Sequence, residues 1–253
     1  MLDPRWLLLL LIFIRMTSFF VIVPFLTIRG IPALVKIGLA GLISYLIFIV
    51  LDAEDFLFPQ NMAEFLFMSL GEVLVGLTLG FVVFLVFGGI RIAGQVIDLQ
   101  MSLLMASVFD PQYGSPVTLV GQLYYQLGLV YFFIINGHHS LFVALTGSYR
   151  IVPAGMHTLG ETTVWGIMNI FFWIFTLAVQ IALPVVTTIL MVDLTLGLIS
   201  KTVPQLHVFM VGLPLKIGVG LFALVLVIPL MTGVFENIFG QMVKEMLNIM
   251  GTF

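Results

Sequence analysis

The sequence has no cysteine and few charged residues. Of its 253 residues, 8% are Asp, Glu, Lys or Arg, and the formal net charge is -3. The missing cysteines exclude disulfides, thiol nucleophiles and cysteine-ligated metals. The 9 basic residues form no block that could bind nucleic acid. A soluble domain carries about 25% charged residues, so this chain has too few to cover a surface in water.

The sequence contains long runs without a charged residue. The chain is 61% hydrophobic, its mean hydropathy is +1.24, and no charged residue occurs from Pro111 to Tyr149 or from Thr162 to Val192. A helix needs about 20 apolar residues to cross the hydrocarbon of a membrane. The sequence therefore predicts an all-α integral membrane protein built of helical hairpins. About six apolar segments are expected, at Trp6–Ile28, Ile37–Leu51, Phe65–Ile90, Val117–Ile135, Val164–Val192 and Val208–Phe235.

Local signals refine this outline without fixing an orientation. Turn chemistry at Asn136-Gly137 separates two segments. The short second segment fits a tilted, half-buried or re-entrant helix. Arg5 precedes the first segment while Arg29 and Lys36 follow it, so the rule that places basic loops in the cytoplasm contradicts itself here.

Arg15 lies in the middle of the first apolar segment. An arginine at the centre of a membrane helix costs about 3 kcal/mol, which the surrounding Leu, Ile, Phe and Val residues offset. Its side chain must then face protein or water rather than lipid. Two interpretations remain: a snorkelling or structurally paired charge, or a contact between helices or subunits that assembly requires.

Glu72 begins a row of residues spaced four apart on the third segment. Glycines at this spacing allow another backbone to approach closely, and a carboxylate on the same face is directed into that contact. We therefore expect the face to pack against a helix; proton or cation binding in a transporter is the alternative. The row consists of Glu72, Gly76, Gly80, Phe84 and Gly88.

Polar residues then recur at helical spacing from Arg91 through Gln95 and Asp98 to Ser102. They predict an amphipathic helix that runs into a loop. At membrane depth such a loop must be buried in protein or line an aqueous cavity. Met101 and Met105, one turn apart before the loop, could line a narrow constriction. The loop residues are Phe109, Asp110, Pro111, Gln112, Tyr113, Gly114, Ser115 and Pro116.

The sequence contains no recognisable catalytic or metal-binding pattern. His138 and His139 are adjacent, which points them to different sides of a helix, and no third ligand lies nearby. Phosphate-binding loops, nucleophile elbows and zinc signatures are missing. We expect neither enzyme activity nor a metal or other cofactor.

Taken together, the motifs resemble the FliR family, a flagellar export-gate subunit whose relatives of the SpaR and YscT type serve virulence secretion. The matching pieces follow the family's order along nearly the whole chain. They are Arg15-Met16-Thr17-Ser18 before Pro24, Gly71-Glu72 with Gly76 and Gly80, Gly94-Gln95 with Asp98 and Gln100, Phe109-Asp110-Pro111, Asn136-Gly137-His138, and Pro204-Gln205 with Phe209, Gly212, Pro214 and Lys216.

The resemblance implies a protein-export gate in the bacterial inner membrane, within the flagellar basal body. Residues 1–160 would form a region similar to FliP, with a plug loop near 106–118 that projects into the pore. Residues 161–253 would form a hairpin similar to FliQ. The partners implied are FliP-like and FliQ-like subunits, exported unfolded proteins, and an FlhB-like subunit at the loop from Pro204 to Lys216.

A secondary transporter for a small solute is the alternative function. Its support comes from Glu72, Asp98 and Asp193 within apolar segments and from the broken helices. Such a transporter would carry an inverted internal repeat, which the order of polar and apolar segments does not display.

Overall fold

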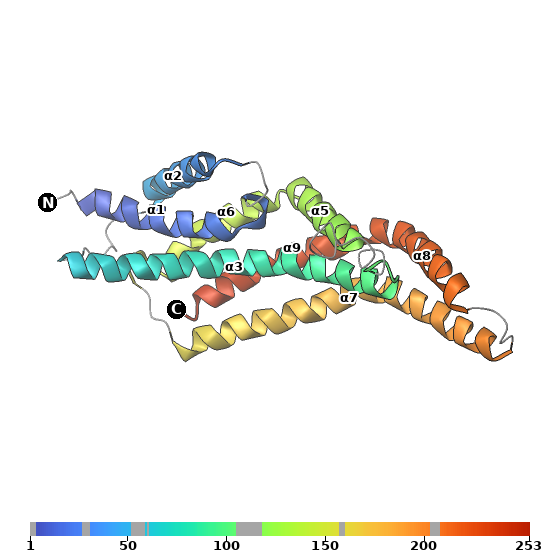
Figure 1. The fold of residues 1–253 in the computed structure, drawn as a ribbon. Helices are drawn as coiled ribbons and strands as arrows, with labels where there is room; N and C mark the ends of the chain where they lie inside the picture. The colour runs from blue at the N-terminus through green and yellow to red at the C-terminus, as the bar shows by residue number, and fades with distance from the viewer. Residues whose placement is uncertain are drawn as a thin grey trace. The chain divides into compact units, whose positions relative to one another are not determined.

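A computed structural model describes residues 4–26, 31–51, 59, 61–104, 118–156, 160–202 and 208–253. Every regular element in these ranges is a helix (Figure 1). Five of the described helices are long and apolar enough to span a membrane, or up to six if a bent pair is one span, which confirms the all-α membrane class. The elements are α1 (Pro4–Ile22), the 3-10 helix η1 (Pro24–Leu26), α2 (Ala33–Val50), α3 (Met62–Gln100), α5 (Leu119–Ile134), α6 (Gly137–Ile151), α7 (Glu161–Thr202), α8 (Val208–Val227), the 3-10 helix η4 (Ile228–Leu230) and α9 (Met231–Met250).

Helix α3 is one helix of 39 residues, although the sequence predicted an apolar segment followed by a separate amphipathic helix at Arg91. No proline or turn sequence lies between Ile90 and Gln100, and the exposed arginine is a good helix former, so the backbone continues. The helix ends before Ser102, whose φ of 61° is left-handed. The sequence predicted that the helical row starting at Arg91 would include Ser102, and this is wrong because the helix ends before that residue.

The turn predicted at Asn136-Gly137 is confirmed. Asn136 has a left-handed backbone, with φ 56° and ψ 32°, which asparagine tolerates better than most residues. It lies between the end of α5 and the start of α6. Helix α6 was not predicted, because its histidines, Thr146 and Arg150 lower the hydropathy of the segment. Its buried face contains Leu141 and Leu145 and also the polar Ser148.

The last third of the chain has longer helices than the sequence predicted. Helix α8 begins at Val208, so Phe209, Gly212, Pro214 and Lys216 lie in a helix and not in the expected loop. The correction has a physical reason: membrane helices tolerate proline because neighbouring groups satisfy the freed carbonyl. Pro229 lies in η4, and α9 then continues the helical chain well past the predicted end at Phe235.

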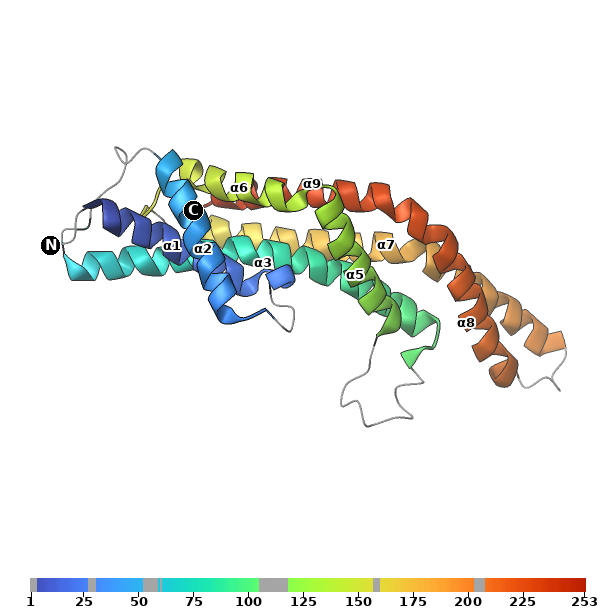
Figure 2. The same ribbon diagram turned by 90° about the horizontal axis from the view of Figure 1, so that it is seen from above.

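The chain divides into two compact units, which are described separately. The first comprises Met1–Val86, Asn136–Phe172 and Phe239–Phe253. There α1 packs against α2 and lies alongside the first part of α3 (Figures 1 and 2). The second comprises Phe87–Ile135 and Trp173–Ile238, in which α8 lies beside the second part of α7. The predicted division into a FliP-like part, residues 1–160, and a FliQ-like part, residues 161–253, is a separate matter from these two units, and it stays a prediction.

Candidate functional site

The side chain of Arg15 is completely buried in the first unit and paired with Glu72. Its Nε donates to Oε2 of Glu72 at 2.6 Å, and its Nη2 donates to Oε1 at 3.1 Å. Glu72 is itself 1% exposed. Parallel hydrogen bonds of this kind are the strong, directional form of an arginine–carboxylate contact.

The remaining donors of the guanidinium reach α6 and the turn that follows it. Nη1 donates to Oγ of Ser148 at 3.1 Å, and Nη2 also donates to the carbonyl of Val152 at 3.0 Å. The guanidinium carbon lies 4.0 Å from the ring centroid of Tyr149, close enough for a cation–π contact. The pair therefore joins α1, α3 and α6 through one buried network.

Gly155 completes this network from the turn. Its N–H donates to Oε1 of Glu72 at 2.8 Å. Its φ of +80° is left-handed, and a Cβ added there would lie 3.1 Å from Sδ of Met68. The left-handed backbone conformation thus favours glycine at this position, and the space beside Met68 is tight.

The pairing of Arg15 with Glu72 makes the arginine a structurally paired charge and also a contact between helices, α1 and α3. That assembly requires this contact stays a prediction. The sequence did not predict which residue pairs with Arg15. A signal was available, because ionisable groups in membrane segments usually pair with one another. Arg15 in the first segment and Glu72 in the third are the charges of opposite sign within those segments, so they were candidates for such a pair.

The row of glycines on α3 divides into a packed half and an open half. A Cβ at Gly76 would collide with the carbonyl oxygen of Arg15, and one at Gly80 would lie 2.9 Å from the carbonyl oxygen of Phe19. These two glycines therefore allow α1 of the same chain to approach. Phe84 is 50% exposed, and a Cβ at Gly88 would meet no atom of the described chain within 4 Å.

In the second unit, Asp98 connects α3 to the beginning of α5. It is 0% exposed; its Oδ1 accepts a hydrogen bond from the N–H of Val120 at 3.0 Å, and its Oδ2 accepts one from Gly121 at 3.1 Å. The first N–H groups of a helix have no acceptor within the helix, and its dipole favours an anion there. The carboxylate therefore caps α5.

A close backbone contact lies beside this cap. A Cβ at Gly94 would lie 2.5 Å from Cα of Gly121. Together with Asp98, the two glycines hold the end of α3 against the start of α5. These positions lie on either side of the predicted plug loop, whose residues Phe109 to Pro116, with Met105, fall outside the described residues.

Met101 packs inside the second unit. Its side chain is 0% exposed, and a Cβ at Gly220 of α8 would lie 2.7 Å from its Cγ and Cε. To line a constriction as predicted, Met101 would have to leave this contact.

An ion pair joins α7 to α8. Nζ of Lys216 lies 2.5 Å from Oδ1 of Asp193, with side chains 21% and 34% exposed respectively. The sequence assigned Lys216 to a partner-contact loop and did not predict this pair. Of the other residues assigned to that loop, Pro204, Gln205 and the side chain of Phe209 lie outside the described part, while Gly212 approaches Leu196 of α7.

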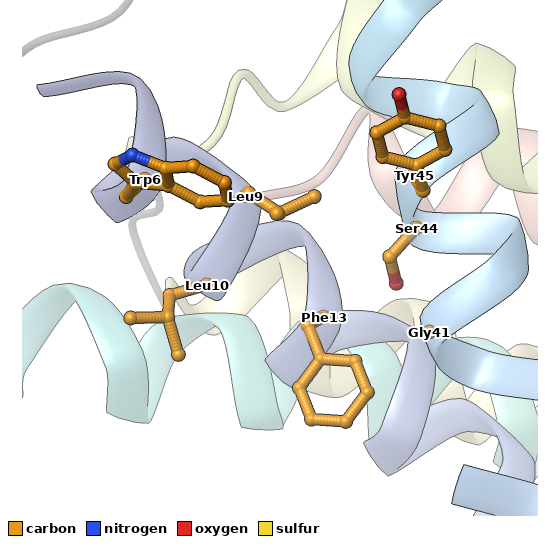
Figure 3. A pocket seen from close by; sticks show the side chains of 7 residues that line it. All are labelled: Trp6, Leu9, Leu10, Phe13, Gly41, Ser44 and Tyr45. Carbon is orange, nitrogen blue, oxygen red and sulfur yellow. The ribbon is translucent and has the colours of Figure 1, made fainter. Parts of the chain in front are cut away.

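A groove of about 500 Å³ lies between α1 and α2 (Figure 3). The hydroxyl of Ser44, one of its few polar groups, donates to the carbonyl of Ala40 at 2.6 Å. Solute sites present a few convergent polar groups, whereas this lining is almost entirely apolar. The lining residues are Trp6, Leu9, Leu10, Phe13, Gly41, Ser44 and Tyr45.

No group of three potential metal ligands occurs among the described residues, His138 and His139 included.

Comparison with known sequences decides the family. The family model described as bacterial export proteins, family 1, matches residues 6–242. The chain belongs to this family. The chain is 34% identical over 244 residues to the flagellar biosynthetic protein FliR of Bacillus subtilis, covering 95% of this chain and 93% of the relative. It is 30% identical to the FliR proteins of Escherichia coli, over 89% and 86% of the two chains, and of Aquifex aeolicus, over 93% and 91%.

Family membership confirms the resemblance to FliR that the motifs predicted. It places the chain among bacterial export proteins, which work with other subunits of an export apparatus, and not among small-solute transporters. The buried contacts agree, because Glu72 and Asp98, two of the acidic residues cited for a transporter, both accept hydrogen bonds within the chain.

Replacing Arg15 with Met should strongly destabilise the first unit. It leaves the buried carboxylate of Glu72 unpaired, and breaking one side of a buried pair costs about 3–5 kcal/mol. The double variant Arg15→Met, Glu72→Met should recover part of that loss. Thermal unfolding of the detergent-solubilised protein by circular dichroism measures both. Arg150→Ala, at an exposed position of α6, is the control; equal melting of Arg15→Met and wild type would contradict this account.

Gly76→Ala and Gly88→Ala should have opposite effects, because a separation of twelve residues places the two glycines about 120° apart around α3. A methyl group at Gly76 overpacks the contact with α1, which typically costs about 1–3 kcal/mol. At Gly88 the space is free and alanine favours the helix by up to about 1 kcal/mol. The same melting experiment compares them. A loss at Gly88 as large as that at Gly76 would show that the open half is also packed in the protein.

Lys216→Glu should weaken the pairing of α7 with α8, because it places two carboxylates together. Adding Asp193→Lys reverses the pair and should restore the yield of membrane complex. Lys201→Glu, at an exposed position near the end of α7, is the matched control. Complex yield and protein export are measured side by side. Restored yield without restored export would assign Lys216 a role in docking as well as packing, whereas a normal yield for Lys216→Glu alone would refute the structural role.

Proposed function

We propose that this chain is a structural and gating subunit of the flagellar protein-export channel in the bacterial inner membrane, within the basal body. The observation that carries the proposal is the 34% identity to a flagellar biosynthetic protein FliR across 95% of the chain. The relatives' names favour the flagellum over a virulence secretion system. The subunit acts by forming and closing a passage and catalyses no reaction.

The proposed partners are FliP-like and FliQ-like subunits, with residues 1–160 and 161–253 occupying places like theirs. Support comes from α7, whose 42 residues extend about 63 Å, twice the roughly 30 Å of hydrocarbon. Trp165, Leu183 and Leu198 along it are each more than half exposed. Apolar surface beyond the lipid needs protein to cover it.

The loop from Phe109 to Pro116 is proposed as the plug. Its supporting observation is the cap that Asp98 makes on α5, since this contact and the Gly94–Gly121 approach fix the two ends between which the loop runs. A loop whose ends are held in place can close a passage at a defined position. An FlhB-like subunit is proposed to bind at the tip of the hairpin formed by α7 and α8, next to Pro204 and Gln205.

Shortening Phe109–Pro116 should leave assembly intact and make the membrane permeable to small ions. Conductance of cells or of reconstituted complexes measures the leak, and co-purification of the partner subunits measures assembly. An equal shortening within 52–58, between α2 and α3, is the control and should not leak. A shortened loop that assembles yet conducts like wild type would remove the plug role.

A further inference from the structure

The groove between α1 and α2 runs along the outward face of α1 (Figure 3). The residues that it takes from α1 recur at helical spacing, so they form one stripe along that helix. Leu8, Leu11 and Arg15, on the other side of α1, are each at most 3% exposed. The groove therefore lies on a surface that the described part of the unit leaves uncovered. Its lining is Trp6, Leu9, Leu10 and Phe13 from α1 and Gly41, Ser44 and Tyr45 from α2.

Two small residues of α2 open this groove. Gly41 has no side chain, and a Cβ placed there would lie 3.8 Å from Cε2 of Phe13, an ordinary van der Waals separation. Ser44, one turn further along, donates its hydroxyl to the carbonyl of Ala40 at 2.6 Å and offers no free donor to the groove. The two helices therefore leave a hollow whose wall is almost entirely hydrocarbon.

The lengths of α1 and α2 match a membrane. With 19 and 18 residues they extend about 28 and 27 Å, close to the roughly 30 Å of hydrocarbon. Around α2, the side chains of Ile37, Leu42 and Val50 are each at least 50% exposed. At about 100° per residue they spread over more than half of the helix's circumference. A helix with this surface belongs in lipid, so the groove beside it opens to hydrocarbon.

An acyl chain fits this groove better than the other candidate occupants. Water is excluded because an apolar cavity stays dry. Spread over the roughly 10 Å from Trp6 to Phe13, about 500 Å³ gives a cross-section of about 50 Å², whereas a helix about 10 Å across needs about 80 Å². An extended peptide would bring N–H and C=O groups that the lining cannot satisfy. A narrow hydrocarbon chain has neither difficulty, and it supplies the contacts that an unfilled hollow loses.

One end of the groove carries the groups expected beside a lipid headgroup. Trp6 and Tyr45 lie at this end, and Phe13 and Gly41 lie at the other (Figure 3). Tryptophan and tyrosine are enriched at membrane interfaces, where the ring meets hydrocarbon and the N–H or O–H meets water. Arg5 precedes Trp6 in the first turn of α1 and is exposed. A cation at this level complements the phosphate of a phospholipid.

We propose that the groove between α1 and α2 binds one acyl chain of a membrane phospholipid, with the phosphate at the level of Arg5, Trp6 and Tyr45. The bound chain contacts two helices at once and fills the space between them. Lipids on the other sides of α2 contact one helix and exchange freely. The inference does not depend on the proposed export function, because it rests on the shape and chemistry of the groove.

Photocrosslinking in native membranes tests the proposal. Cells that make the full chain with its partner subunits are supplied with a fatty acid that carries a diazirine in its chain and enters their phospholipids. Irradiation before and after extraction into mild detergent, followed by mass spectrometry, maps the adducts. Adducts on Leu9 and Phe13 should survive extraction, whereas those on Leu34, which is 81% exposed on α2, should disappear.

Two leucine substitutions show whether the groove holds the lipid. Gly41→Leu fills the groove and should abolish the adducts that survive extraction. Gly38→Leu is the matched control and should leave them unchanged, since Gly38 lies outside the groove and a Cβ there would meet no described atom within 4 Å. Wild-type adducts in Gly41→Leu would overturn the proposal. Absence of groove adducts before extraction would overturn it too, because a partner subunit would then cover the groove.

A fluorescence measurement keeps the proposal testable if Gly41→Leu does not fold. Trp6 and Trp165 are 59% and 56% exposed, but of the two only Trp6 lines the groove. Variants of the full chain with Trp173→Phe and either Trp165→Phe or Trp6→Phe are purified with a phospholipid brominated in its acyl chains, which quenches tryptophan. Excess unbrominated phospholipid is then added. Quenching of Trp6 should persist after that of Trp165 is lost, and equal loss at both positions would show surrounding lipid only and overturn the proposal.

Discussion

A charged pair inside an apolar unit, Arg15 with Glu72, constrains the arrangement of everything around it. Either charge alone would be strongly destabilising, so the native arrangement must bring both together with every remaining hydrogen bond made. The partners come from α1, α3, α6 and the turn at Gly155. One set of contacts therefore sets the relative position of segments separated by up to 137 residues in sequence. A purely apolar contact would tolerate sliding, whereas this network accepts one register.

The second unit applies the same physical solution with a different donor. Asp98 is also a carboxylate in an apolar region, and backbone N–H groups of α5 satisfy it in place of water. Glu72 likewise accepts from the backbone of Gly155. These two carboxylates are thus engaged in holding helices, which leaves them unsuited to carry a solute.

The sequence predicted what depends on neighbours along the chain. Apolar runs near 20 residues identified the membrane class, and Asn136-Gly137 identified the turn, because both signals are local. It missed α6, whose buried stripe contains Ser148 and whose polar residues lower its hydropathy. It also missed the pairing of Arg15 with Glu72 and of Lys216 with Asp193, since spacing gives the face of a helix but not the helix opposite. The start of α8 at Val208 agrees with the predicted segment, but the expected loop from Pro204 to Lys216 extended too far, because a membrane helix tolerates Pro214.

The lengths of α3 and α7 limit how far a rule of membrane orientation applies to this chain. The rule that basic loops remain in the cytoplasm applies to helices that cross as independent spans. Helix α3 extends about 58 Å and α7 about 63 Å, each roughly twice the hydrocarbon thickness. Neither can be matched to a bilayer along its whole length, so part of each must lie against protein. A rule based on independent insertion therefore loses its premise for α3 and α7.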